Sequence, residues 1–291
     1  MQPAGPRDSP TARQPGRSGR PALSELPPRE GGKIHRAISR ARLPVLVLCL
    51  VLGIWEGLIR GLEVPGYVVP APSAVAQAFF AGVFSGAYFP DLAITTLETV
   101  VGFALGSLIG LAIGIAIVVF PACERIVYPY VVAIQTIPKV AIAPLMVVWF
   151  GFGMTSKVIV VALVALFPVL VNAIAGLKAV DQDRLDLLGA LSATRWQVFR
   201  YLRFPNALPF IFAGLNTAIV LSVIGAIVGE FVGSNKGIGF RILQANYQLD
   251  IAGAFALFAV LSILGVTLHA ILRFVERRTV FWTAAQETHR P

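Results

Sequence analysis

The sequence is poor in charged residues, which make up 13% of its 291 residues. A soluble domain usually carries about a quarter. Apolar residues make up 56%, and several apolar runs reach the length of about 20 residues that a bilayer core requires. These runs leave too few residues for a separate globular domain. The composition therefore excludes a soluble two-domain protein and favours one bundle of transmembrane helices.

Cysteine and histidine are also scarce. The two cysteines, Cys49 and Cys123, and the three scattered histidines show no metal-ligand spacing. We expect two reduced, inert thiols and no metal site. The apolar runs contain no Ser/His, metal or paired-acid constellation, which disfavours a membrane-embedded enzyme. No G-x-x-x-x-G-K-[ST] phosphate loop occurs either, so energy for any transport must come from a partner chain or from an ion gradient.

The net charge of +9 is distributed as membrane topology requires. Nine of the 24 Lys and Arg residues precede residue 43, and most others lie in short stretches between apolar runs. A nucleic-acid-binding protein would need a folded basic face instead, so we expect no nucleic-acid partner. Residues 1–42 are predicted to be a disordered, basic cytoplasmic tail, since the first 33 residues include seven Pro and five Gly. Residues 281–291 are predicted to be a second cytoplasmic tail.

Six membrane spans are predicted within a transmembrane domain of residues 43–280. The spans are residues 43–59, 92–120, 126–150, 158–177, 207–228 and 251–275, with an amphipathic surface helix near residues 70–84. With the N-terminus inside, inside segments carry 19 Lys and Arg residues and outside segments carry four, namely Arg60, Lys157, Lys236 and Arg241. The positive-inside rule therefore predicts an all-α, multi-pass inner-membrane protein with both termini and loop 178–206 in the cytoplasm.

Two predicted spans have unusual sequences. In the second, Gly102, Gly106, Gly110 and Gly114 recur at intervals of four and predict a smooth helix-packing seam, either within one bundle or between two copies. The third contains Pro129, Pro138 and Pro144, and its freed backbone groups must face protein or water.

Polar residues within the spans are candidates for a translocation pathway, namely Lys139, Asn172, Asn216 and Ser222. Hydrogen bonding between helices is the alternative role for the neutral residues, and snorkelling to an interface is the alternative for Lys139. Glu98 is interpreted as an acid placed favourably near the start of its helix.

Loop 178–206 is the most informative segment. Residues 186–191 predict a short helix with Asp181 and Asp183 in its N-terminal region, followed by a turn at residues 192–196 and a second helical stretch at residues 197–204. Such a helix-turn-helix with exposed apolar residues is typical of a docking surface. An interfacial helix lying on lipid headgroups is the alternative.

This loop resembles the "EAA" loop of the permeases of ATP-driven (ABC) importers. Asp186 aligns with the Glu, Leu187 and Leu188 with the two Ala, Ser192 with the Gly and Pro205 with the closing Pro of that pattern. Segments 69–75, 137–145, 149–153 and 229–239 are similar to the nitrate/sulfonate/taurine branch of the family. The resemblance implies that Ala193, Arg195 and Trp196 belong, with these five residues, to the surface that couples to the ATPase.

The family resemblance also implies the partners. They are two cytoplasmic ATPases that bind ATP and Mg, a periplasmic substrate-binding protein and a second permease copy, with no cofactor on this chain itself. The expected solute is small and anionic or heterocyclic, such as nitrate, a sulfonate or taurine. The alternative is an ion-coupled secondary transporter, which predicts inverted repeats and paired midplane acids. The sequence shows neither.

Overall fold

The computed structural model describes residues 31–282, and every regular element in that range is a helix. The α-helices are α1 (Gly31–Gly61), α2 (Pro72–Phe84), α3 (Phe89–Val119), α4 (Pro121–Gln135), α5 (Ala143–Phe150), α6 (Met154–Lys178), α7 (Gln182–Ala190), α8 (Arg195–Val198), α9 (Phe204–Gly233), α10 (Ile238–Tyr247) and α11 (Ile251–Thr279). A 3₁₀ turn, η1 (Lys139–Ile142), precedes α5, and a π-helical turn, η2 (Phe199–Arg203), joins α8 to α9.

The chain divides into two units at Gly53, and the following paragraphs concern the unit that begins at Ile54. Helix α1 begins at Gly31, whereas the sequence predicts a structureless tail up to residue 42. Residues 33–43 contain neither Gly nor Pro, so nothing local opposes a helix there. The tails predicted for residues 1–30 and 283–291 lie outside the described residues.

Five helices are long and apolar enough to cross a membrane, or six if the bent pair formed by α4 and η1–α5 counts as one span. Helices α3, α6, α9 and α11 coincide with predicted spans to within a few residues at most ends. The all-α membrane fold is thus confirmed. Lys157, which the charge count placed in an outside segment between two spans, lies within a helix: α6 begins at Met154, and Lys157 is buried in its first turn.

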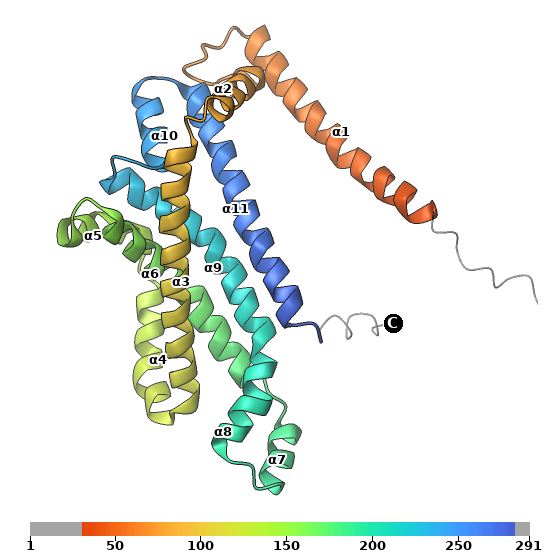
Figure 1. The fold of residues 1–291 in the computed structure, drawn as a ribbon, viewed down its shortest axis with the longest axis vertical. Coiled ribbons are helices and arrows are strands. Elements are labelled where there is room, and N and C mark those ends of the chain that lie inside the picture. The colour runs from red at the N-terminus through yellow and green to blue at the C-terminus, as the bar shows by residue number, and fades with distance from the viewer. Residues whose placement is uncertain (1–30, 283–291) are drawn as a thin grey trace, which may run out of the picture. The chain divides into compact units, whose positions relative to one another are not determined.

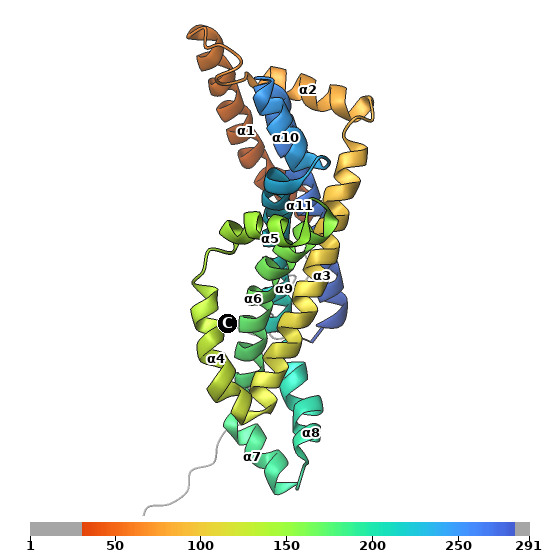
Figure 2. The same cartoon turned by 90° about the vertical axis from the view of Figure 1, so that its left-hand side faces the viewer.

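Helices α3, α6 and α9 form the core of this unit (Figures 1 and 2). Along α6, Val161, Ala165 and Val169 are fully buried. The glycine stripe of α3 faces α6, so the seam lies within this chain. A Cβ atom at Gly106 would lie 2.9 Å from the Cα of Ala162, closer than such atoms pack. The two backbones therefore touch, which is how helices gain van der Waals contact in lipid.

The third predicted span is broken. The axes of α4 and of the η1–α5 segment differ by 84° across residues 136–138 (Figure 2). Pro138 has an extended backbone at this break, and Pro144 lies in the first turn of α5, where a missing N–H costs no hydrogen bond. Pro129, by contrast, lies inside α4 without ending it. The prolines therefore predicted that this span is interrupted, but not the sharp change of direction between α4 and α5.

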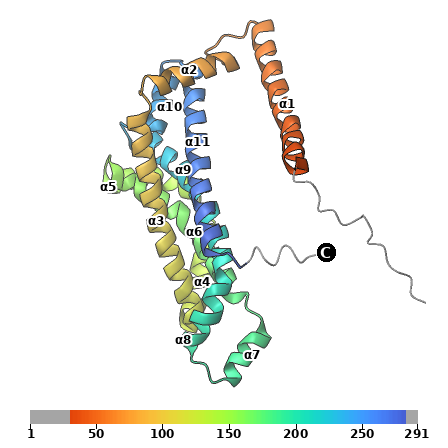
Figure 3. The ribbon, with the colours of Figure 1, turned by 45° about the vertical axis from the view of Figure 1, so that its right-hand side comes forward.

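Two short helices cover the end of the bundle that lies opposite α7. Helices α2 and α10 both pack against α11 (Figure 3), and Ile238 and Ile242 of α10 are buried against Leu257 and Leu261. The sequence predicts that the fifth span ends at residue 228. Instead, α9 continues to Gly233 and a short turn leads into α10.

Candidate functional site

The first candidate site is the α7–α8 loop, which protrudes from one end of the bundle (Figures 1 and 2). Asp181 caps the start of α7, since its side chain accepts a hydrogen bond from the N–H of Asp183 at 3.3 Å. At the other end of α7, Ser192 N–H donates to Gly189 O and Ala193 N–H to Leu188 O, at 2.9 and 3.0 Å. This pair of bonds is a Schellman motif.

Ser192 occupies the left-handed position of that motif, with φ +56°. This conformation favours glycine, because a Cβ there approaches the following carbonyl. The position is the one at which the resemblance aligned Ser192 with the family's glycine. The backbone geometry thus explains why the aligned pattern carries glycine there, and Ser192 adopts the same geometry at some conformational cost.

The segment after the turn is also held locally. Thr194 and Gln197 form a capping box: the Thr194 side chain accepts from Gln197 N–H, and the Gln197 side chain accepts from Thr194 N–H at 2.7 Å. From Arg195 the helix runs without interruption through η2 and α9 to Gly233. Pro205 lies in the first turn of α9.

Large apolar side chains are exposed on this loop. Leu187 is 62% exposed, Leu191 69% and Trp196 65%. The Trp196 ring stacks on Phe199, with the ring centroids 5.6 Å apart. A cavity of about 670 Å³ lies between this region and the end of α3, and it is lined by Ile115, Val118, Val119, Phe120, Ala193, Arg195, Trp196, Val198, Phe199 and Arg203. Asp186 is exposed and accepts a hydrogen bond from Gln182.

The four residues predicted to line a pathway each have a separate hydrogen-bond partner. Lys139 donates to Gln135 O at 2.7 Å and lies 4.5 Å from the centre of the Phe167 ring, so it caps the end of α4. Ser222 is fully buried and bonds to Ala218 O of its own helix. Asn172 likewise bonds to its own helix, at Pro168 O.

Asn216 behaves differently from these three residues. Its amide donates to Glu276 Oε2 at 2.9 Å and so ties α9 to α11. The sequence analysis had offered such interhelical bonding as the alternative to a pathway role.

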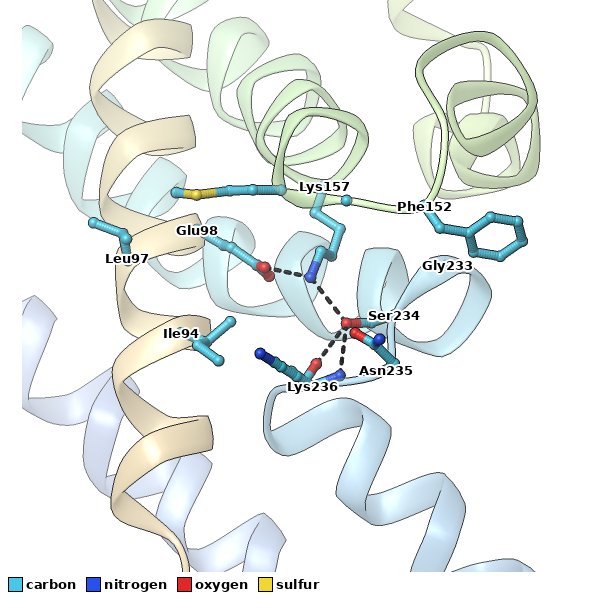
Figure 4. A pocket seen from close by; sticks show the side chains of 11 residues that line it. Ile94, Leu97, Glu98, Phe152, Lys157, Gly233, Ser234, Asn235 and Lys236 are labelled. Carbon is cyan, nitrogen blue, oxygen red and sulfur yellow. Dashed lines mark hydrogen bonds and ion pairs between the residues drawn. The ribbon is translucent and has the colours of Figure 1, made fainter.

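Sequence reasoning missed a buried charged cluster at the other end of the bundle. Glu98 and Lys157, 1% and 5% exposed, form an ion pair between α3 and α6, and Lys157 Nζ donates to Ser234 Oγ at 2.9 Å (Figure 4). The reading of Glu98 as a helix-start acid is therefore wrong, because it lies in the third turn of α3 and is paired. The partners come from separate helices, so no local pattern predicts the pair.

A second buried carboxylate, Glu230, fixes the turn between α9 and α10. It accepts hydrogen bonds from Thr95 Oγ1, at 2.6 Å, and from Gly239 N–H. Its carboxylate fills the space where a Cβ of Gly237 would lie. Asp91 of α3 holds the same turn, since it pairs with Arg241 and accepts from Gly237 N–H at 2.7 Å.

A cavity of about 490 Å³ opens beside this cluster (Figure 4). Its lining comes from α3, the start of α6 and the turn after α9, and comprises Ile94, Leu97, Glu98, Phe152, Gly153, Met154, Lys157, Gly233, Ser234, Asn235 and Lys236. Its volume lies in the range of small-molecule sites, roughly 300 to 1,000 Å³.

The long apolar helices, the protruding α7–α8 loop and the buried charged cluster are together typical of a multi-pass membrane transport subunit. Residues 102–281 match the family described as the binding-protein-dependent transport system inner membrane component, and the chain belongs to that family. It is a permease of the ABC-importer type and a plasma-membrane protein.

Relatives that are named for their solutes are similar to most of this chain. The riboflavin transport system permease protein RibX of Chloroflexus aurantiacus is 33% identical over 254 residues, covering 86% of this chain and 95% of RibX. The formylaminopyrimidine transport permease protein ThiX of Halalkalibacterium halodurans is 35% identical, covering 84% and 96%. The taurine transport system permease protein TauC of Escherichia coli is 28% identical, covering 82% and 89%. Such relatives agree with the nitrate/sulfonate/taurine branch.

Solved structures show the same fold. An amino acid ABC transporter matches with a TM-score of 0.58 at 20% identity, covering 69% of this chain and 98% of that chain. The MetNI methionine ABC transporter matches with a TM-score of 0.54 at 22% identity, covering 66% and 94%.

Proposed function

We propose that the chain forms the membrane pathway of an importer that contains two permease copies, two ATPases and a substrate-binding protein. ATP and Mg bind to the ATPases, and no cofactor binds to this chain. Loop 178–206 docks on an ATPase, with Asp186, Leu187, Leu188, Ser192, Ala193, Arg195, Trp196 and Pro205 forming or shaping the contact. The proposal follows from the family membership and from the shape of the loop.

The observation that carries the proposal is the exposed apolar surface of a rigidly capped loop. Leu187, Leu191 and Trp196 are each more than half exposed, on a segment fixed by a cap, a Schellman motif and a capping box. Such a surface marks an interaction site. The acids Asp181, Asp183 and Asp186 on the same helix would be repelled by anionic headgroups, which favours a protein partner over the lipid surface.

The solute is proposed to be small and either anionic or heterocyclic. RibX and ThiX are named for heterocyclic solutes, and TauC for a sulfonate. Ion-coupled transport is not favoured, because the family and the relatives are components of binding-protein-dependent systems.

ATP-driven uptake tests this proposal. The permease is co-reconstituted into proteoliposomes with its co-purifying ATPase and binding protein, and uptake of the solute held by that binding protein is measured. We expect Leu187→Asp to reduce uptake at least tenfold, because it places a charge in an apolar contact. Ala122→Asp adds the same charge at an exposed position outside the loop, in the first turn of α4, and should leave uptake within twofold of wild type. Uptake that persists in Leu187→Asp, or that proceeds without ATP, contradicts the proposal.

A further inference from the structure

The Glu98–Lys157 pair is an unusual way to hold a helix bundle together. Both side chains are more than nine-tenths buried, in helices that span the membrane. Desolvating two charges costs about as much as their attraction returns, so such a pair adds little net stability. Ionisable groups placed at such sites in membrane proteins more often serve a solute path. The pair therefore calls for a role beyond packing.

Lys157 also lines a cavity and has one N–H donor that its protein partners do not use. An ammonium group carries three N–H donors, and two of those on Lys157 are taken by Glu98 and Ser234. Lys157 lines the 490 Å³ cavity (Figure 4). Its third donor has no partner within residues 31–282.

The remaining polar lining of the cavity also suits an anion. Lys236 and Asn235 lie exposed at its edge, and the cavity-lining charges comprise two ammonium groups against the one carboxylate of Glu98. The first turn of α6 borders the cavity at Gly153 and Met154, where backbone N–H groups lack helical partners and favour negative charge. Glu230, the other nearby acid, does not line the cavity and is bonded to Thr95 and Gly239.

We propose that this cavity is a binding site for the anionic group of the solute, a sulfonate, carboxylate or nitrate, with Lys157 as its principal partner. Glu98 occupies Lys157 when the site is empty, so no buried ammonium is left uncompensated. An arriving anion competes with Glu98 for that ammonium, and Lys236 adds attraction at the entrance. This inference rests on the proposed transport function and assigns the solute chemistry to residues at the end of the bundle opposite α7.

Replacing Glu98, the carboxylate that competes with the anion for Lys157, tests this proposal. The full chain is purified in lipid nanodiscs, and binding of sodium ethanesulfonate, of sodium nitrate and of neutral ethyl methyl sulfone is measured by calorimetry. We expect saturable binding of at least one of the two anions and none of the sulfone. The nearly isosteric change Glu98→Gln should tighten anion binding about tenfold, because Lys157 then loses the carboxylate with which it is paired. A role in packing alone predicts no gain in affinity.

The double variant Glu98→Gln/Lys157→Gln removes both charges of the pair and so leaves neither partner behind as an uncompensated ion. It should abolish anion binding, whereas Lys178→Gln, which alters a lysine paired with Glu124 outside the cavity, should leave the affinity unchanged. Anion binding that is absent, unchanged or weaker in Glu98→Gln, or retained in the double variant, overturns the inference.

The same preparations separate this inference from the transport proposal. Leu187→Asp should lose ATPase binding while keeping wild-type anion affinity, because the cavity and the loop share no residue. Failure of the anion test with intact ATPase binding removes the site and leaves the transport proposal standing. Failure of ATPase binding by the wild-type chain removes the transport proposal instead.

Discussion

The sequence alignment and the backbone conformation both indicate that the position of Ser192 favours glycine. Its φ of +56° costs about 1 kcal/mol for a residue with a Cβ, and the residue holds the Schellman turn on which the loop depends. The aligned family pattern has glycine there, which is the residue that the conformation favours. Having serine in place of the glycine of the pattern therefore strains the backbone locally but leaves the turn itself unchanged.

Replacing Ser192 tests this local reading. Ser192→Gly should strengthen the turn and slow amide hydrogen exchange at Ser192 and Ala193 roughly threefold to fivefold, which corresponds to about 1 kcal/mol. Ser192→Val should speed exchange at the same amides, because a β-branched residue is poorly accommodated at positive φ. Equal exchange in all three proteins would mean that the turn is not held in the left-handed conformation.

For Lys139, a role in the translocation pathway and a role as a helix cap predict different results for one substitution. It donates to the last carbonyl of α4 and lies over Phe167. As a helix cap, Lys139→Met should speed exchange at the end of α4 and change solute uptake less than twofold. A tenfold loss of uptake with unchanged exchange would restore Lys139 to the translocation pathway.

At the scale of elements, apolar length and positive charge predicted most of the helices. Spans 92–120, 158–177 and 251–275 correspond to α3, α6 and α11, because about 20 apolar residues in a row have few alternatives in a bilayer. The α7 region was also predicted, because Asp181 and the following apolar residues form a recognisable helix start.

The sequence does not predict which residues pair between helices or by how much the chain changes direction between them. Glu98 meets Lys157, and Glu230 meets Thr95, only after α3, α6 and α9 pack together. The 84° bend lies at Pro138, and the segment beyond it packs on α6, a contact that the local sequence does not reveal. The continuity of α8, η2 and α9 was missed because Pro205 separated the second helical stretch of the loop from the fifth span. In the structure Pro205 lies in the first turn of α9, directly after the π-helical turn.

The glycine stripe of α3 makes a further prediction about elements. Gly106→Ala forces α3 and α6 apart, because the added Cβ meets the Ala162 backbone. We expect a loss of about 1 to 3 kcal/mol, typical of overpacking, measured as a lower midpoint of thermal unfolding in detergent. Gly265→Ala in α11 is the control, since no atom lies within 4 Å of the added Cβ. Equal midpoints in the two variants would show that the α3–α6 seam is not closely packed.

At the scale of the whole permease unit, one continuous helical span joins the two candidate sites. It begins at Arg195 in the protruding loop and ends at Gly233, which lines the cavity beside Lys157. Such a span can pass a displacement of the loop to the cavity without a flexible joint. We thus expect that ATPase binding to the α7–α8 loop alters the access of solute to the cavity beside Lys157.

The measurement that tests the central claim most directly is a pull-down of the tagged chain from its native membranes in mild detergent, with partners identified by mass spectrometry. We predict recovery of an ATPase carrying a G-x-x-x-x-G-K-[ST] loop, in about equal amount to the permease, and its loss in Leu187→Asp but not in Ala122→Asp. Recovery of the chain alone, repeated after crosslinking in the membrane, would contradict the account.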